Sequence, residues 1–147
     1  MSIRKVAEQD INDIRALIRS LSHYYLSNKN DELPRWFLNT LTFEQLLDRI
    51  NSDDFIHVLY ILEGEIVGYI AIKTDGHVYH LFVSERAQGQ GIAKALWTHV
   101  KLECKCESYT VRSSIYAVPV YKSFGFVESG SVGTKDGISF QPMECSP

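Results

Sequence analysis

A glycine-bearing loop between a predicted strand and a predicted helix is the segment best suited to bind an anion. Residues 77–93 read HVYHLFVSERAQGQGIA, with Gly89 and Gly91 directly before the helical pattern. Glycine lets the backbone approach a bulky group closely, and the free N–H groups of a helix's first turn attract negative charge. The loop is neither a dinucleotide fingerprint nor a Walker loop, since Lys94 replaces the third small residue and no Gly-Lys-Ser/Thr follows. We therefore predict a pyrophosphate site; a glycine-marked turn without a ligand is the alternative.

A second segment with chemical potential lies further along the chain. Residues 111–126 read VRSSIYAVPVYKSFGF. The pattern predicts a strand, a short helix that opens near Pro119, and a Gly125-Phe126 step into another strand. The helix carries Tyr121.

The hydrophobic pattern around these two segments predicts one mixed α/β domain. The chain has 147 residues, close to the roughly 150 expected per domain, and no repeat or linker divides it. The predicted strands cover 2–6, 55–62, 65–73, 77–84, 109–115, 126–132 and 138–143, and the predicted helices 11–21, 43–50, 89–106 and 117–124. Thr42 and Gln45 predict a capping box for the second helix. The order β-α-α-β-β-β-α-β-α-β-β indicates a mainly antiparallel central sheet flanked by helices.

Composition and charge exclude several classes of partner. Fifteen Lys and Arg against eighteen Asp and Glu give a net charge of -3, and no basic cluster suits a nucleic acid backbone. No apolar run approaches the roughly 18 residues of a membrane span, and the N-terminus carries no signal-peptide core. We expect a cytoplasmic protein that binds neither nucleic acid nor membrane.

The three cysteines predict no metal site. Cys104, Cys106 and Cys145 lack the spacing of a zinc site. Cys104 and Cys106 fall within one predicted helix, too close together to bridge readily, so we expect reduced thiols.

Together the two segments resemble the GNAT superfamily of acetyl-coenzyme A-dependent N-acetyltransferases. The matching pattern is, in order, Leu81-x-Val83, Arg86-x-x-Gly89-x-Gly91 and Ala117-x-x-Val120-Tyr121-x-x-x-Gly125-Phe126. The predicted order of elements is similar to that fold across nearly the whole chain. The resemblance implies a single N-acetyltransferase domain over residues 1–147 with acetyl-coenzyme A as cosubstrate.

The resemblance also implies how the cofactor is held. The pantetheine arm would lie beside Phe82 and Val83 and hydrogen-bond along the strand, as an added strand would. Arg86 would help to neutralise the pyrophosphate. Many family members have an Asn where this chain has Ser114, whose shorter hydroxyl can still hydrogen-bond to pantetheine. The main-chain N–H groups that would cradle the pyrophosphate belong to Gln88, Gly89, Gln90, Gly91, Ile92 and Ala93.

For catalysis, the resemblance places Tyr121 where many relatives have a tyrosine that protonates the departing thiolate. The alternative is an aromatic core residue. The amine must lose a proton before it attacks; relatives often use a strand carboxylate, which this chain lacks. His77 is the candidate base because it shares strand parity with Leu81, and a structural histidine is the alternative. The Val83 N–H would meet the carbonyl oxygen as it gains charge, as in relatives.

Residues 22–41 lie where relatives build the wall of the acceptor pocket. The aromatic side chains Tyr24, Tyr25, Trp36 and Phe37 fit that role, with packing in the core as the alternative.

The predicted function is acetyl transfer to a primary amine, on a small molecule or a peptide, by direct attack. No covalent acetyl-enzyme is expected, because no Cys-His-Asp relay is visible. Two alternatives remain: an inactive acetyl-coenzyme A sensor or protein-interaction module, and an unrelated α/β interaction domain. The exposed last strand also permits a homodimer.

Overall fold

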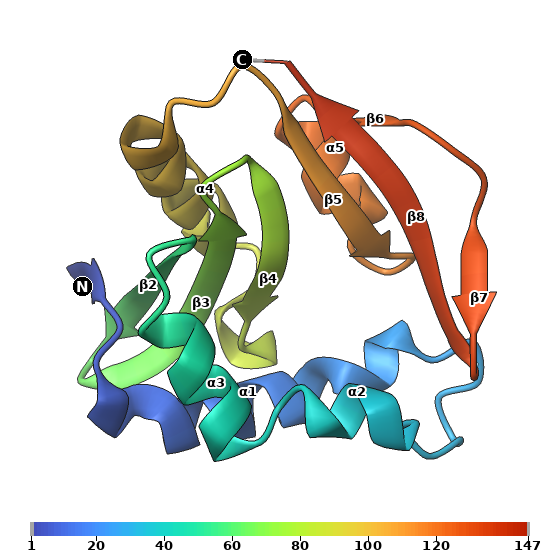
Figure 1. Cartoon of the computed structure of the whole chain (residues 1–147), viewed down its shortest axis with the longest axis horizontal. Coiled ribbons are helices and arrows are strands. Elements are labelled where there is room, and N and C mark those ends of the chain that lie inside the picture. The colour runs from blue at the N-terminus through green and yellow to red at the C-terminus, as the bar shows by residue number, and fades with distance from the viewer. Residues whose placement is uncertain (1, 147) are drawn as a thin grey trace.

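The computed structural model describes residues 2–146 and has helices on both faces of an open sheet (Figure 1). The eight strands are β1 (Ser2–Lys5), β2 (Phe55–Leu62), β3 (Glu65–Lys73), β4 (His77–Val83), β5 (Tyr109–Ser114), β6 (Val127–Glu128), β7 (Gly133–Lys135) and β8 (Ile138–Cys145). They are ordered β1-β2-β3-β4-β5-β8-β6, and β7 also pairs with β8. Every pairing is antiparallel except that of β4 with β5. The predicted mixed, mainly antiparallel α/β fold is confirmed.

The described residues form five α-helices and three 3-10 helices. They are α1 (Ile11–Leu21), α2 (Arg35–Asn39), α3 (Phe43–Ile50), α4 (Ile92–Cys104) and α5 (Val118–Ser123), with 3-10 helices at Glu8–Asp10, Ser22–Tyr25 and Glu85–Ala87. The Thr42 side chain accepts a hydrogen bond from the Gln45 N–H at 3.3 Å and starts α3. This bond is one half of the predicted capping box, and it satisfies a backbone donor that the helix itself cannot pair.

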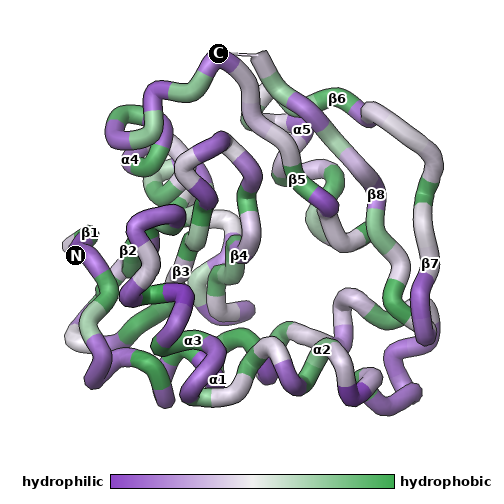
Figure 2. Tube along the Cα trace, viewed as in Figure 1, coloured by the Kyte–Doolittle hydropathy of each residue, from purple (hydrophilic) through white to green (hydrophobic). Residues whose placement is uncertain are grey.

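Two hydrophobic layers hold the helices on the sheet. Helix α4 buries Ile92 and Leu96 against one face, and α1 buries Ile14 and Ile18 against the other. The alternation of hydrophobic and hydrophilic residues along both helices is visible in Figure 2. Gly68 of β3 lies under α4, where a Cβ would stand 3.0 Å from atoms of Ile92 and Leu96. The glycine therefore lets the start of α4 approach the sheet closely.

The predicted strand over 126–132 is wrong. Only Val127 and Glu128 pair with β8 before the pairing ends. The Ser129 N–H donates to the Pro142 carbonyl at 3.0 Å, but Pro142 has no N–H to return the bond, so the ladder stops there. A separate short strand, β7, begins at Gly133.

The predicted helix over 89–106 is also too long at both ends. Gly91 is the N-cap of α4, and Lys105 adopts a left-handed conformation with φ of 49° that ends it. Cys106 therefore lies outside the helix. Its Sγ is 2.9 Å from the Sγ of Cys104, and both cysteines are free thiols.

Within residues 2–146, no helix has the length and apolar character needed to cross a membrane. The same residues contain no group of three or more His, Cys, Asp and Glu side chains placed to hold a metal ion.

A buried histidine under α3 predicts a loss of stability in mild acid. The Nε2 of His57 donates to the Arg49 carbonyl at 3.1 Å, so its Nδ1 accepts from the Tyr69 hydroxyl at 2.7 Å. Burial lowers the pKa of His57 from 6.5 to about 4. The unfolded chain thus takes up the proton first, and stability falls as the pH drops from about 6.5 to about 4. We expect His57 to contribute a loss of the order of 3 kcal/mol.

Denaturant unfolding at pH 7.0 and pH 4.5 tests this expectation. His57→Gln should lose less stability between the two pH values than the unmodified chain. His99→Gln replaces a half-buried histidine of α4 that contacts Glu103, and it should not reduce that loss. An equal loss in all three proteins would contradict the role of His57.

Candidate active site

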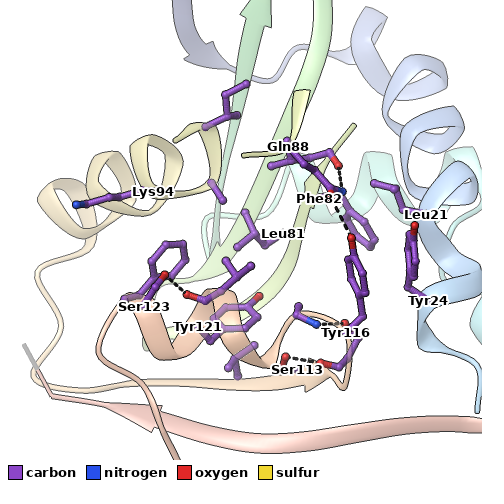
Figure 3. Close-up of a pocket in the computed structure, with 18 of the residues that line it drawn as sticks. Leu21, Tyr24, Leu81, Phe82, Gln88, Lys94, Ser113, Tyr116, Tyr121 and Ser123 are labelled. Atoms are coloured by element: carbon purple, nitrogen blue, oxygen red, sulfur yellow. Dashed lines mark hydrogen bonds between the residues drawn. The ribbon is translucent and has the colours of Figure 1, made fainter. Parts of the chain in front are cut away.

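The site forms where β4 and β5 separate. The two strands pair only through His77 with Thr110 and Val78 with Val111. Beyond these pairs they diverge, and a cavity of about 530 Å³ opens between them. Residues of β4, the following loop, the first turn of α4, β5, α5 and the end of α1 line this cavity (Figure 3).

The loop between β4 and α4 presents bare backbone to the cavity. Gly89 and Gly91 have φ of 78° and 80°, and a Cβ at either position would meet no atom within 4 Å. No side chain of residues 2–146 caps the start of α4. An anion can therefore approach the N–H groups of this helix terminus, as the sequence predicted.

The edge of β4 offers hydrogen-bonding groups on the same side. The Ser84 N–H donates to the Val67 carbonyl of β3 at 2.8 Å. Because backbone groups of successive strand residues point to opposite sides, the Val83 N–H and C=O point away from β3 and toward the gap. This orientation suits an extended ligand that adds to the strand edge.

Tyr121 of α5 lines the cavity and is held by aromatic neighbours. Its ring contacts Phe124 and Phe126 edge-on, with centroids 6.0 and 5.4 Å away, and is only 5% exposed. Burial raises the pKa of Tyr121 above its ordinary value, and the nearby Tyr25 raises it further. No hydrogen bond engages its hydroxyl within the described chain. Tyr121 is therefore a protonated donor without a partner at the wall of the cavity.

A chain of side chains crosses the cavity beside the strand edge. The Tyr116 hydroxyl donates to Gln88 Oε1 at 2.9 Å, and Gln88 Nε2 donates to the Val83 carbonyl at 3.0 Å. The Tyr116 ring stacks on Tyr24 at 3.9 Å and 15°. The Tyr24 hydroxyl in turn donates to Glu85 at 2.9 Å. Figure 3 shows Tyr24 and Tyr116 together at the opposite end of the pocket from Lys94.

Several residues expected at the site lie elsewhere or have other partners. The Arg86 side chain forms an ion pair with Glu65, and neither Arg86 nor Gln90 lines the cavity. Ser114 lines it, but its Oγ accepts a hydrogen bond from the Ala117 N–H at 3.2 Å. The structure does bring together Phe82, Val83, Gln88, Gly89, Gly91, Ile92, Ala93, Ser114 and Tyr121 around one cavity.

His77 lies at the closed end of the gap. Its Nδ1 is 2.8 Å from Thr110 Oγ1, and it does not line the cavity. In the pairing of β3 with β4, Ala71 faces His80 and Ile72 faces Val78, so Tyr79 has no partner. This irregularity is a β-bulge at Tyr79. Val78 and Leu81 therefore share the α4 face of the sheet, and the expectation that His77 shares a face with Leu81 is wrong. Burial lowers the pKa of His77.

Among the lining residues that sequence reasoning missed are Tyr116 and Arg112. Tyr116 joins the site only through its contacts with Gln88 and Tyr24, which are distant in sequence. Arg112 had no local signal, because its place depends on the divergence of β4 and β5. Arg112 and Lys94 are the charged residues among the described lining, which contains no Asp or Glu.

These features define a class of protein: an α/β domain with a cavity, at a split between two parallel strands, whose shape suits an extended anionic ligand. Residues 25–147 match the family model described as an acetyltransferase (GNAT) domain. The chain therefore belongs to the GNAT acetyltransferase family, and acetyl transfer is its general chemistry. No curated protein sequence matches the chain.

Solved structures share this fold over the whole chain. The paia N-acetyltransferase of Thermoplasma acidophilum, in complex with coenzyme A, has a TM-score of 0.79 at 17% identity, covering 99% of this chain and 98% of that chain. The ribosomal-protein-alanine N-acetyltransferase of Brucella melitensis has a TM-score of 0.74 at 21% identity, covering 100% of both chains. An aminoglycoside 6'-N-acetyltransferase complexed with coenzyme A has a TM-score of 0.74 at 12% identity, covering 99% and 97%. These likenesses show the fold.

Proposed function

We propose that this protein transfers an acetyl group from acetyl-coenzyme A to a primary amine by direct attack. One observation carries the proposal: the bare glycine loop, the free edge of β4 and the unpartnered Tyr121 hydroxyl all face one cavity. The loop suits a pyrophosphate, and the strand edge suits an amide-containing arm. In this proposal, the reactive sulfur of such a ligand ends beside Tyr121, which lines the same cavity.

The residues around the cavity have distinct roles in this proposal. Acetyl-coenzyme A, when bound, supplies an acetyl thioester. The main-chain N–H groups of residues 88–93 hold its pyrophosphate, and the Val83 N–H stabilises the carbonyl oxygen as negative charge develops. As the amine nitrogen bonds to the carbonyl carbon and the carbon–sulfur bond breaks, Tyr121 gives its proton to the sulfur. The proton that the attacking nitrogen gives up passes through solvent and restores the phenol of Tyr121.

The proposal assigns no catalytic role to His77, which does not reach the cavity. Much of the rate then comes from holding the amine and the thioester together, because proximity replaces a bimolecular encounter. The raised pKa of Tyr121 keeps the phenol protonated at neutral pH, as a donor requires.

A binding function without turnover is the second candidate. It is favoured by the lack of any Asp or Glu among the described lining residues, since relatives often use a carboxylate to receive the amine proton. Release of free thiol, measured across amines, amino acids, polyamines, aminoglycosides and peptides, separates the two. Release that depends on an amine supports the enzyme. Saturable cofactor binding without release from any acceptor would support the binding function instead.

Gln88→Ala should tighten cofactor binding. The Gln88 side chain occupies the Val83 carbonyl, which the pantetheine arm needs, while the Gln88 main chain remains in the cradle. Losing one competing hydrogen bond should lower the Kd for coenzyme A about 2- to 10-fold. Isothermal titration calorimetry measures the change. Weaker binding would show that the Gln88 side chain itself contacts the cofactor.

A further inference from the structure

The charges that line the cavity suggest which amines it accepts. The charged lining residues in the described chain are two cations, Lys94 and Arg112. The described lining residues include no carboxylate that could form an ion pair with an ammonium group. An acceptor with several positive charges would be repelled, whereas an acceptor with a negative group would be attracted.

The two cationic side chains, Lys94 and Arg112, lie on different faces of the sheet. Lys94 lies in the first turn of α4, beside the glycine loop. On β5, Val111 packs in the hydrophobic layer under α4, so Arg112, the next residue, points to the opposite face. The cofactor's phosphates belong at the start of α4, on the other face from Arg112. Arg112 is therefore not part of the pyrophosphate site.

Arg112 also lacks an anionic partner within residues 2–146. No Asp or Glu of that range lies within 4.0 Å of its guanidinium. Its nearest aromatic contact is the ring of Phe140 on β8, with the centroid 5.6 Å away. Its positive charge contributes to the lowered pKa of His77. The guanidinium is thus free to pair with a ligand, and no neighbouring carboxylate competes.

We propose that Arg112 recognises an oxyanion on the acceptor, so that the substrate is an amine that also carries a carboxylate or phosphate group. This inference rests on the proposed acetyl transfer and names its substrate class. The planar guanidinium donates two parallel hydrogen bonds to such a group. Anchoring the anion would leave the amine of the same molecule directed at the gap between β4 and β5. Arg112 is a specificity-determining residue in this arrangement.

Matched pairs of acceptors test the inference. Leucine against leucinamide isolates a carboxylate, phosphoethanolamine against ethanolamine isolates a phosphate, and spermidine represents a polycation. We expect the anionic member of at least one pair to have a kcat/KM about 10- to 100-fold higher. Leucinamide holds more neutral amine at a given pH, so a preference for leucine cannot come from amine basicity. The pair with the larger ratio identifies the oxyanion.

The variant Arg112→Gln should abolish that preference and leave the Kd for acetyl-coenzyme A unchanged. Arg19→Gln, which removes an exposed positive charge from α1, should keep the preference. Turnover without preference, a preference for spermidine, or a preference that survives in Arg112→Gln would overturn the inference. If no amine releases thiol, acetyl transfer itself fails. Binding of the same pairs to the coenzyme A-saturated protein then decides the inference, and equal affinities within each pair overturn it.

Discussion

Replacing Tyr121 with phenylalanine is expected to lower kcat about 100- to 1,000-fold and to change the Kd for acetyl-coenzyme A by less than about threefold, since a positioned acid contributes roughly 10²- to 10⁴-fold. The substitution removes one hydroxyl that has no hydrogen-bond partner in the described chain. It leaves the ring that packs on Phe124 and Phe126. Steady-state kinetics gives kcat, and calorimetry gives the Kd.

Tyr109→Phe is the matched control. Tyr109 is also a buried tyrosine, 2% exposed, but it does not line the cavity and its hydroxyl accepts from the Cys106 N–H. This variant should keep kcat. An unchanged kcat in Tyr121→Phe would remove Tyr121 from the acid role, and a lost cofactor affinity would assign it to packing.

Gly89→Val should weaken acetyl-coenzyme A binding at least about 30-fold. A Cβ at position 89 would enter space that contains no protein atom within 4 Å. Apart from the backbone strain of the positive φ, the new Cβ therefore meets no protein neighbour and lies in the space proposed for the ligand. It would displace an anion held by several charge-assisted hydrogen bonds, each worth about 1.5 to 3 kcal/mol.

Gly64→Val separates that effect from backbone strain. Gly64 lies in the turn between β2 and β3, has φ of 79°, and also has no atom within 4 Å of an added Cβ. Both variants should lose a similar amount of thermal stability, because a β-branched residue is strained at positive φ. Only Gly89→Val should lose cofactor affinity. Equal Kd values in the two variants would contradict the cradle.

Local signals predicted much of the fold. The strands predicted over 55–62 and 65–73 leave two residues, Glu63 and Gly64, for the turn that the structure shows, and Thr42 caps α3 as its spacing with Gln45 indicates. Such features depend on residues only a few positions apart, which a sequence displays directly. The glycine loop before α4 is a feature of the same kind.

Two of the errors arise where a partner distant in sequence decides the outcome. Pro142 of β8 ends the pairing of β6, and no residue in 126–132 reveals that. The bulge at Tyr79 appears only in the register of β4 against β3, and it moves Leu81 to the other face from His77. An alternation rule applied across a bulge gives the wrong face for every residue beyond it.

The residues of the candidate site also form two groups: those that local motifs predicted and those that depend on distant parts of the chain. The cradle and Tyr121 come from contiguous motifs, so their positions could be predicted. Tyr116 and Arg112 join the cavity because β4 and β5 diverge after two residue pairs, a property of the whole sheet. The segment with Tyr24 and Tyr25 does line the cavity, whereas Trp36 and Phe37 do not. The Trp36 Nε1 instead donates to Asp136 at 2.8 Å.

Calorimetric titration of the unmodified protein with acetyl-coenzyme A, beside Gly89→Val and Gly64→Val, is the most direct test of the site. We expect one saturable site per chain in the unmodified protein and in Gly64→Val, and strongly weakened binding in Gly89→Val. No saturation of the unmodified protein at millimolar ligand, or equal affinity in all three proteins, would show that the loop before α4 does not hold the cofactor.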